Sequence, residues 1–149
     1  MKTKTKSNHR QAALKEVQLY KRLVNSHDGI CTCISCGKSD LTSRMQGGHF
    51  ISRRCLPTEL ELDNINPQCV SCNLYKNGNV LAYRDALIDR IGYDRVERLE
   101  DLRRAWEGSD EAKERLSVED RKLLKKKSSS DYIEVRKKYA KLNKELKQR

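Results

Sequence analysis

Two Cys-x-x-Cys pairs, Cys33–Cys36 and Cys69–Cys72, constrain the fold of this chain more than any other feature of its sequence. Each pair can turn two sulfur atoms toward one ion, and four thiolates are a usual ligand set of a structural, tetrahedral zinc site. We therefore predict one structural Zn²⁺ bound by these four cysteines. The 32 residues between Cys36 and Cys69 exceed those of a plain zinc ribbon, so an inserted segment is expected between the pairs.

Two further cysteines have less certain roles. Cys31 lies two positions before Cys33, so either thiol could reach the ion. Cys55 has no partner at a metal-ligand spacing, which favours a buried small side chain. The first ten residues contain no apolar stretch and no later run reaches membrane-spanning length. We accordingly expect an intracellular protein, in which paired cysteines favour a metal over a disulfide.

The inserted segment contains a candidate catalytic residue, His49, which directly follows Gly47 and Gly48. A zinc ion with four cysteine ligands has no open position, so catalysis would require other groups. A lone histidine is more often structural than functional. Two preceding glycines, however, would leave space for the backbone of a substrate, and this favours a functional role for His49.

Positive charge is concentrated at the two ends of the chain. The net charge is +11, and residues 1–26 contain seven Lys and Arg against one Glu. Residues 117–149 contain twelve Lys and Arg against five acidic residues, whereas residues 27–116 have a net charge of −2. Such segments can be simply solvated helices, but two of them in a zinc protein favour a nucleic-acid partner.

Hydrophobic periodicity predicts a mostly helical α+β chain. Helices are expected at 8–24, at 81–91, from 93 to 106, and over 117–149 with an interruption at 128–130. Residues 41–51 are the best candidate for a short irregular strand, and 52–62 for a loop. Near the end, five apolar residues recur at spacings of 3, 4, 3 and 4, which predicts a helical seam that packs on the protein's own core or on a symmetry mate: Tyr132, Val135, Tyr139, Leu142 and Leu146.

The order of these motifs resembles the HNH, or His-Me finger, endonucleases, most closely the NinG/Rap recombination proteins of lambdoid phages. Phage endonuclease VII, a Holliday-junction resolvase, is similar more loosely. The matching segment covers about residues 31–96. It comprises Cys33-Ile-Ser-Cys36-Gly37, Gly48-His49-Phe50, Asn64-Ile-Asn-Pro-Gln-Cys69, Cys72-Asn73-Leu-Tyr-Lys76-Asn-Gly78-Asn79, Tyr83-Arg84 and Arg90-Ile91-Gly92.

The resemblance implies a zinc-bound ββα-metal core with flanking basic helices. Residues 30–96 would form the core, between a basic N-terminal arm at 1–29 and a basic helical C-terminal arm at 97–149. The implied function is metal-dependent hydrolysis of phosphodiester bonds in branched DNA, a Holliday junction or a D-loop, during phage or prophage recombination. The protein would then work in the cytoplasm of a bacterial host.

The resemblance also implies roles for individual residues. His49 would be the general base that takes a proton from the attacking water. Asn64 would hydrogen-bond across the two strands and orient the His49 ring. Asn73 would bind a catalytic Mg²⁺ or Mn²⁺ through its amide oxygen. Lys76 would hold a neighbouring phosphate, and we expect Arg53 and Arg54 to contact DNA as well.

One departure from the HNH pattern leaves the catalytic metal site incomplete. Many members have an Asp directly before the catalytic His, where this chain has Gly48. Gln46, Asp63 or a backbone carbonyl could supply the second ligand, or water could fill the position. A non-catalytic zinc-bound nucleic-acid-binding protein is therefore an alternative, and a nuclease fold used only for protein contacts is a third. Symmetric cleavage of a junction would favour a homodimer.

Overall fold

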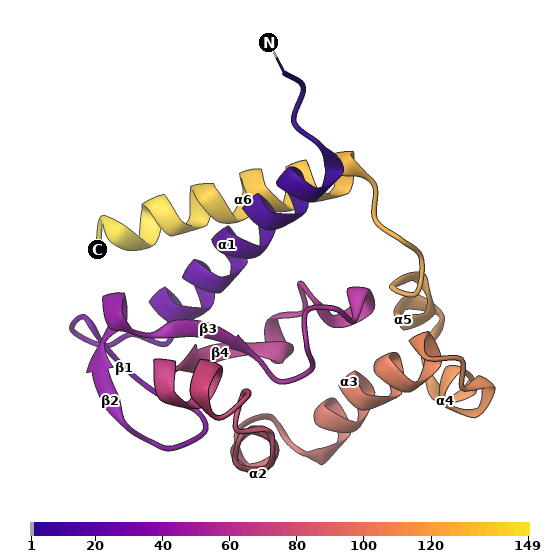
Figure 1. Cartoon of the computed structure of the whole chain (residues 1–149), viewed down its shortest axis with the longest axis horizontal. Helices are drawn as coiled ribbons and strands as arrows, with labels where there is room; N and C mark the ends of the chain where they lie inside the picture. Colours follow the sequence, from indigo (N-terminus) through magenta and orange to yellow (C-terminus); the bar gives the residue numbers. More distant parts are fainter. Residues whose placement is uncertain (1) are drawn as a thin grey trace.

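The computed structural model describes residues 2–149, and within them the chain is mostly helical with two small sheets (Figure 1). This confirms the α+β, mostly helical class. The strands are β1 (Ile30–Thr32), β2 (Ser39–Leu41), β3 (Gln46–His49) and β4 (Ile65–Gln68). The α-helices are α1 (Lys6–Val24), α2 (Val80–Ile91), α3 (Tyr93–Trp106), α4 (Asp110–Arg115), α5 (Val118–Lys122) and α6 (Ser129–Lys147).

The first helix begins and ends close to where the sequence predicts. The Thr5 side chain accepts a hydrogen bond from the backbone N–H of Asn8, which satisfies one of the free donors at the helix start. Ala13, Leu14 and Val17 lie on the buried face of α1. This face packs on β3 and β4, so the hairpin lies between α1 and the pair α2–α3 (Figure 1).

The β3–β4 hairpin is antiparallel and pairs Gly48 with Asn66 and His49 with Ile65. The predicted strand at 41–51 is therefore present but shorter. It follows β2 and a 3₁₀ turn at Thr42–Arg44. Residues 52–62 are not a plain loop, because a 3₁₀ turn occupies Leu56–Thr58.

The two glycines before His49 serve packing within the protein. A Cβ added to Gly47 would lie 2.6 Å from the Cβ of Gln18 on α1. A Cβ added to Gly48 would lie 1.9 Å from Oε1 of Gln68. The expectation that these glycines leave space for a substrate backbone is wrong, since side chains of the same chain occupy that space.

The two helices that follow β4 enclose the main apolar core. Tyr83 and Leu87 of α2 pack with Val96 and Leu99 of α3 and with Phe50, which follows β3. The hydroxyl of Tyr83 also donates a hydrogen bond of 2.8 Å to the carbonyl of Gly48. The core thus fixes the backbone of β3 directly beside His49. Both helices were predicted from their periodicity.

The first and last helices lie side by side, because α6 packs along α1 (Figure 1). The Ser128 side chain and Asp131 form a capping box that starts α6, so the helix begins within the predicted interruption at 128–130. Tyr132 is fully buried, and the ring of Tyr139 contacts that of Tyr20 edge-on at 5.0 Å. The seam predicted in this segment therefore packs within its own chain.

The arrangement brings helices α1 and α6, both rich in Lys and Arg, together on one side of the hairpin (Figure 1). Whether residues 30–96 form a unit without residues 1–29 and 97–149 stays a prediction. Across residues 2–149, none of the helices combines the length and the apolar content needed to cross a membrane.

Candidate metal centre and adjoining cleft

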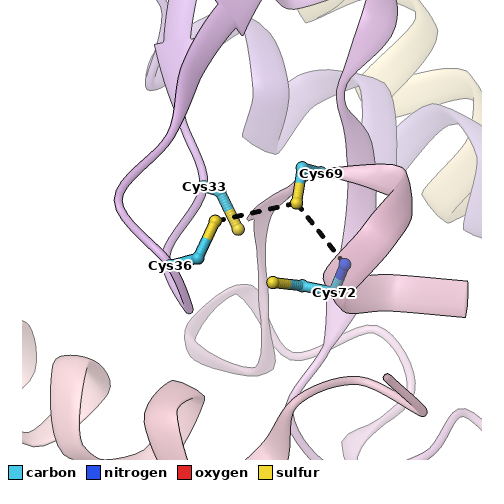
Figure 2. Close-up of side chains that lie close together, drawn as sticks. All are labelled: Cys33, Cys36, Cys69 and Cys72. Atoms are coloured by element: carbon cyan, nitrogen blue, oxygen red, sulfur yellow. Dashed lines mark hydrogen bonds between the residues drawn. The ribbon is translucent and has the colours of Figure 1, made fainter. Parts of the chain in front are cut away.

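The four predicted cysteine ligands lie together. The sulfur atoms of Cys33, Cys36, Cys69 and Cys72 are all within 4.8 Å of one another (Figure 2). Cys33 and Cys36 come from the turn between β1 and β2, whereas Cys69 and Cys72 follow β4. Four cysteine sulfurs at this separation can bind a metal ion such as zinc. The Sγ atoms of Cys36 and Cys69 lie 3.7 Å apart.

The local backbone favours the thiolate form of Cys33. Gly37 has a φ of +76° and closes the first turn by donating its N–H to the carbonyl of Cys33. Burial alone would raise the pKa of the Cys33 thiol, but hydrogen bonds from nearby backbone N–H groups outweigh it and lower this pKa to about 7. In the second turn, the N–H of Cys72 lies 3.4 Å from Sγ of Cys69.

The remaining cysteines lie outside this cluster. Cys31 is buried in β1, opposite Asp40, so Cys33 and not Cys31 belongs to the group of four. Cys55 is buried in the apolar core with Ile34 and Phe50. Its interpretation as a small core residue is confirmed.

A cleft of about 540 Å³ adjoins the cluster. Its floor is β3, and its walls are α1 and the turn that follows Cys72. His49 and Asn73 both line it, so the structure brings the predicted base and the predicted ligand of the catalytic metal to one cavity, whereas Asn64 is not part of its lining. Arg53 lines it too. The full lining is Gln18, Arg22, Met45, Gln46, Gly47, His49, Ser52, Arg53, Asn73, Leu74, Asn77 and Gly78.

His49 is held in one tautomer by a backbone carbonyl. Its Nε2 lies 2.8 Å from the carbonyl oxygen of Glu59. A carbonyl can only accept, so Nε2 carries the proton and Nδ1 keeps a free lone pair. Burial lowers the pKa of His49, which the hydrogen bond to Glu59 offsets only in part. The ring is thus neutral near pH 7 and can accept a proton at Nδ1.

Asn64 is fully buried and fixes the loop that follows His49. Its Oδ1 accepts from the N–H of Ile51, and its Nδ2 donates to the carbonyls of Ile51 and Thr58. No contact of Asn64 with the His49 ring is among these bonds, so the ring is oriented by Glu59 instead. Because Thr58 directly precedes Glu59, Asn64 acts on His49 through that short piece of backbone.

The Glu59 side chain joins this loop to both ends of the chain, a role that the sequence did not reveal. It is completely buried, with Oε2 at 2.6 Å from Nε of Arg10 on α1 and Oε1 at 2.6 Å from the hydroxyl of Tyr132 on α6. Lys127 adds a more distant charge at 3.8 Å. The residue whose carbonyl holds His49 is itself held by helices α1 and α6.

Asn73 lies in a π-helical turn (Ser71–Tyr75) and donates from Nδ2 to Oε1 of Gln46 at 2.7 Å. Within residues 2–149 no protein donor bonds its Oδ1, which therefore remains an available ligand oxygen. Of the side chains considered for a second ligand, Gln46 is in the cleft. Asp63 instead pairs with Arg95 and does not line the cleft.

The three basic residues expected to contact DNA occupy different positions. Arg53 is exposed and lines the cleft beside His49. Arg54 and Lys76 are exposed but lie outside the lining of the cleft. Arg22 also lines the cleft but was not predicted from the sequence. It is one of seven basic residues in the segment 1–26, and nothing in the sequence distinguishes it from the others.

Comparison with known proteins identifies a family. A family model described as "Bacteriophage Lambda NinG protein" matches residues 1–148. The curated Protein ninG of Escherichia phage 933W is 34% identical over 122 residues, which cover 80% of this chain and 55% of the relative. The Protein ninG of Salmonella phage P22 is 36% identical over 111 residues, 72% of this chain and 49% of the relative.

The corresponding protein of Escherichia phage lambda is 34% identical over 111 residues, with the same coverage as the P22 protein. The chain thus spans about half the length of the curated relatives that it matches. No solved structure matches it.

Proposed function

The chain belongs to the NinG family, and on that premise we propose that it is a metal-dependent DNA endonuclease of the HNH type. It hydrolyses phosphodiester bonds of branched recombination intermediates, a Holliday junction or a D-loop, in phage or prophage DNA. The observation that carries this proposal is the state of His49, a neutral imidazole with a free Nδ1 in a cleft shared with Asn73. Strands β3 and β4 and the turn at Ser71–Tyr75 would be the ββα-metal element.

In this proposal His49 is the general base. Its Nδ1 takes a proton from a water molecule as the water oxygen forms a bond to phosphorus. The phosphorus bond to the leaving oxygen breaks, and that oxygen takes a proton from solvent. The hydrogen bond from Nε2 to Glu59 keeps the ring oriented and stabilises the positive charge that the ring gains.

Asn73 supplies an amide oxygen in the same cleft, where Gln46 fixes its orientation. A Mg²⁺ or Mn²⁺ bound there, with phosphate oxygens as further ligands, would neutralise charge on the reacting phosphate. The zinc-type cluster has a separate role, because four cysteines leave no open position. It joins the β1–β2 turn to the segment that presents Asn73.

The charge distribution supports a DNA partner. Arg22 and Arg53 both line the cleft, and none of the lining residues among 2–149 is acidic. Helices α1 and α6, both rich in Lys and Arg, pack together, and α1 packs on the β3–β4 hairpin. A phosphate backbone in the cleft could therefore contact cationic side chains of the core and of the helices together.

One observation favours the alternative, a non-catalytic zinc-bound nucleic-acid-binding protein. The cleft offers amide oxygens from Asn73 and Gln46 but no carboxylate among the described residues. Hard divalent cations usually take at least one carboxylate ligand. In the nuclease, a scissile phosphate would have to provide that negative charge.

Nicking of supercoiled plasmid in Mg²⁺ or Mn²⁺ separates the two functions. The zinc-loaded protein is expected to nick, whereas His49→Ala is not. His27→Ala is the matched control, because the His27 side chain is 97% exposed and lies outside the cleft. Parallel reactions with a four-way junction, a D-loop and linear duplex test the branched substrate. DNA binding without nicking in either cation would favour the alternative.

A further inference from the structure

The guanidinium group of Arg22 has an edge that the protein leaves unpaired. Arg22 extends from the last turn of α1, and its Nη1 donates to the carbonyl of Met45 at 3.1 Å. The Nε atom on the other edge is buried and has no hydrogen-bond partner. No bond from Nη2 is present among residues 2–149 either. Nε and Nη2 are the two donors that together bind a carboxylate or a phosphate in bidentate fashion.

This state is unusual among the partly buried arginines of the chain. Arg10, Arg84 and Arg98 have side chains that are 28, 32 and 29% exposed, and each forms an ion pair with a carboxylate. Arg22 is partly buried as well but forms no ion pair within the described chain. Burial of a cationic group without a partner costs free energy, which an anionic ligand would recover.

The location of Arg22 indicates which anion binds there. Arg22 lines the same cleft as His49 and Asn73, and no acidic side chain among the described residues lines that cleft. We propose that Arg22 forms a phosphate-binding subsite that holds the DNA backbone beside the reacting phosphate. The subsite depends on the proposed function in one respect only, namely that the bound phosphate belongs to DNA.

The distance along β3 separates this subsite from the reaction itself. Arg22 bonds to Met45, while His49 lies four residues further along the same extended segment. Four residues of strand span about 13 Å. The phosphate that Arg22 binds is therefore a different one from the scissile phosphate. Its loss should weaken DNA binding and raise KM, with little effect on kcat.

The test measures DNA binding by the His49→Ala protein in EDTA, so that cleavage and divalent cations play no part. Labelled four-way junction and duplex are titrated from about 50 to 200 mM salt. Adding Arg22→Gln should weaken binding about tenfold. It should also reduce the magnitude of the slope of log K against log salt concentration by about 0.9, the contribution of one phosphate contact. Arg22→Lys should keep the salt slope but lose affinity, because an ammonium cannot bind in bidentate fashion.

Arg103→Gln on α3 is the matched control, because Arg103 is 44% exposed and lies outside the cleft. Equal affinity and slope for Arg22→Gln and its parent would overturn the proposal, as would an equal loss in Arg103→Gln. Should Arg22→Gln not fold, the Nε–H resonance of Arg22 in the ¹⁵N-labelled parent gives the answer. It should shift when a short single-stranded oligonucleotide is added, and an unmoved resonance at saturation would overturn the subsite.

The outcomes are independent of nuclease activity. Failure of the Arg22 test with intact plasmid nicking would remove the subsite and leave the nuclease. Dependence on Arg22 without nicking in either cation would keep the phosphate subsite in a protein that only binds DNA.

Discussion

The carbonyl oxygen of Glu59 lies 2.8 Å from Nε2 of His49, and the side chain of the same Glu59 contacts both terminal helices. The orientation of the candidate base thus depends on residues at the two ends of the chain. Arg10 and Tyr132 are separated by more than a hundred positions in the sequence, yet both bind one buried carboxylate. Helices α1 and α6 therefore support the cleft as well as adding positive charge.

Replacing His49 tests the candidate base directly. We expect His49→Ala to slow nicking by about 10²–10⁴, the usual contribution of general-base catalysis. DNA binding should stay within a few-fold, because a neutral imidazole contributes little to phosphate affinity. Initial nicking rates and binding isotherms, with His27→Ala beside them, provide the measurement. Retained nicking by His49→Ala would assign the base to another residue.

The pH dependence of cleavage follows from the burial of His49. Burial lowers its pKa from the usual value of 6.5, so the unprotonated base persists into mildly acidic solution. The acidic limb of kcat/KM should therefore have its midpoint below 6.5, with the rate lost only as pH falls further. Rates from pH 5 to 8 at constant ionic strength check this. A midpoint above 6.5 would show that another group titrates.

Zinc content tests the four-cysteine cluster. Purified protein should contain about one Zn²⁺ per chain. Serine at position 33, 36, 69 or 72 should largely unfold residues 31–80, because metal binding and folding are coupled. Cys55→Ala is the control, since Cys55 lies in the apolar core and outside the cluster. Soluble, folded protein without zinc in elemental analysis would contradict the prediction.

Removing the hydroxyl group of Tyr132 tests the contact between α6 and Glu59. Tyr132→Phe removes a 2.6 Å hydrogen bond to a buried carboxylate and should destabilise the protein by about 1–3 kcal/mol. Because the carbonyl of Glu59 holds His49, kcat for nicking should fall while KM is unchanged. Tyr139→Phe is the control, since the Tyr139 ring contacts Tyr20 and its hydroxyl forms no hydrogen bond within residues 2–149. Equal kcat in both variants would show that the contact between α6 and Glu59 does not affect catalysis in the cleft.

The sequence predicted those features that depend on local spacing. The helices at 81–91 and 93–106 follow from apolar residues at three- and four-residue steps, and the grouping of Cys33 with Cys69 follows from paired metal-ligand spacing. Cys31 and Cys33 could not be separated in this way, because both lie within reach of one ion. Only the fold of β1 distinguishes them.

Features that depend on contacts between distant segments were missed or misread. Gly47 indicated a close approach, but nothing local showed that Gln18 of α1 makes it. Glu59 read as an ordinary loop residue, since its partners Arg10 and Tyr132 lie 49 and 73 positions away. Arg22 was one basic side chain among several, and its unpaired edge exists only in the folded chain.

The contact between Gly48 and Gln68 also limits how this protein can evolve. An aspartate directly before the histidine, as many HNH endonucleases have, would place its Cβ 1.9 Å from Oε1 of Gln68. Position 68 would have to become smaller first, yet Gln68 also bonds Ser35 and the carbonyl of Gly78. That first mutation therefore lowers stability before the second can bring a benefit. We therefore expect the effects of substitutions at positions 48 and 68 to depend on each other, because an aspartate at 48 fits only once the side chain at 68 is shorter or displaced.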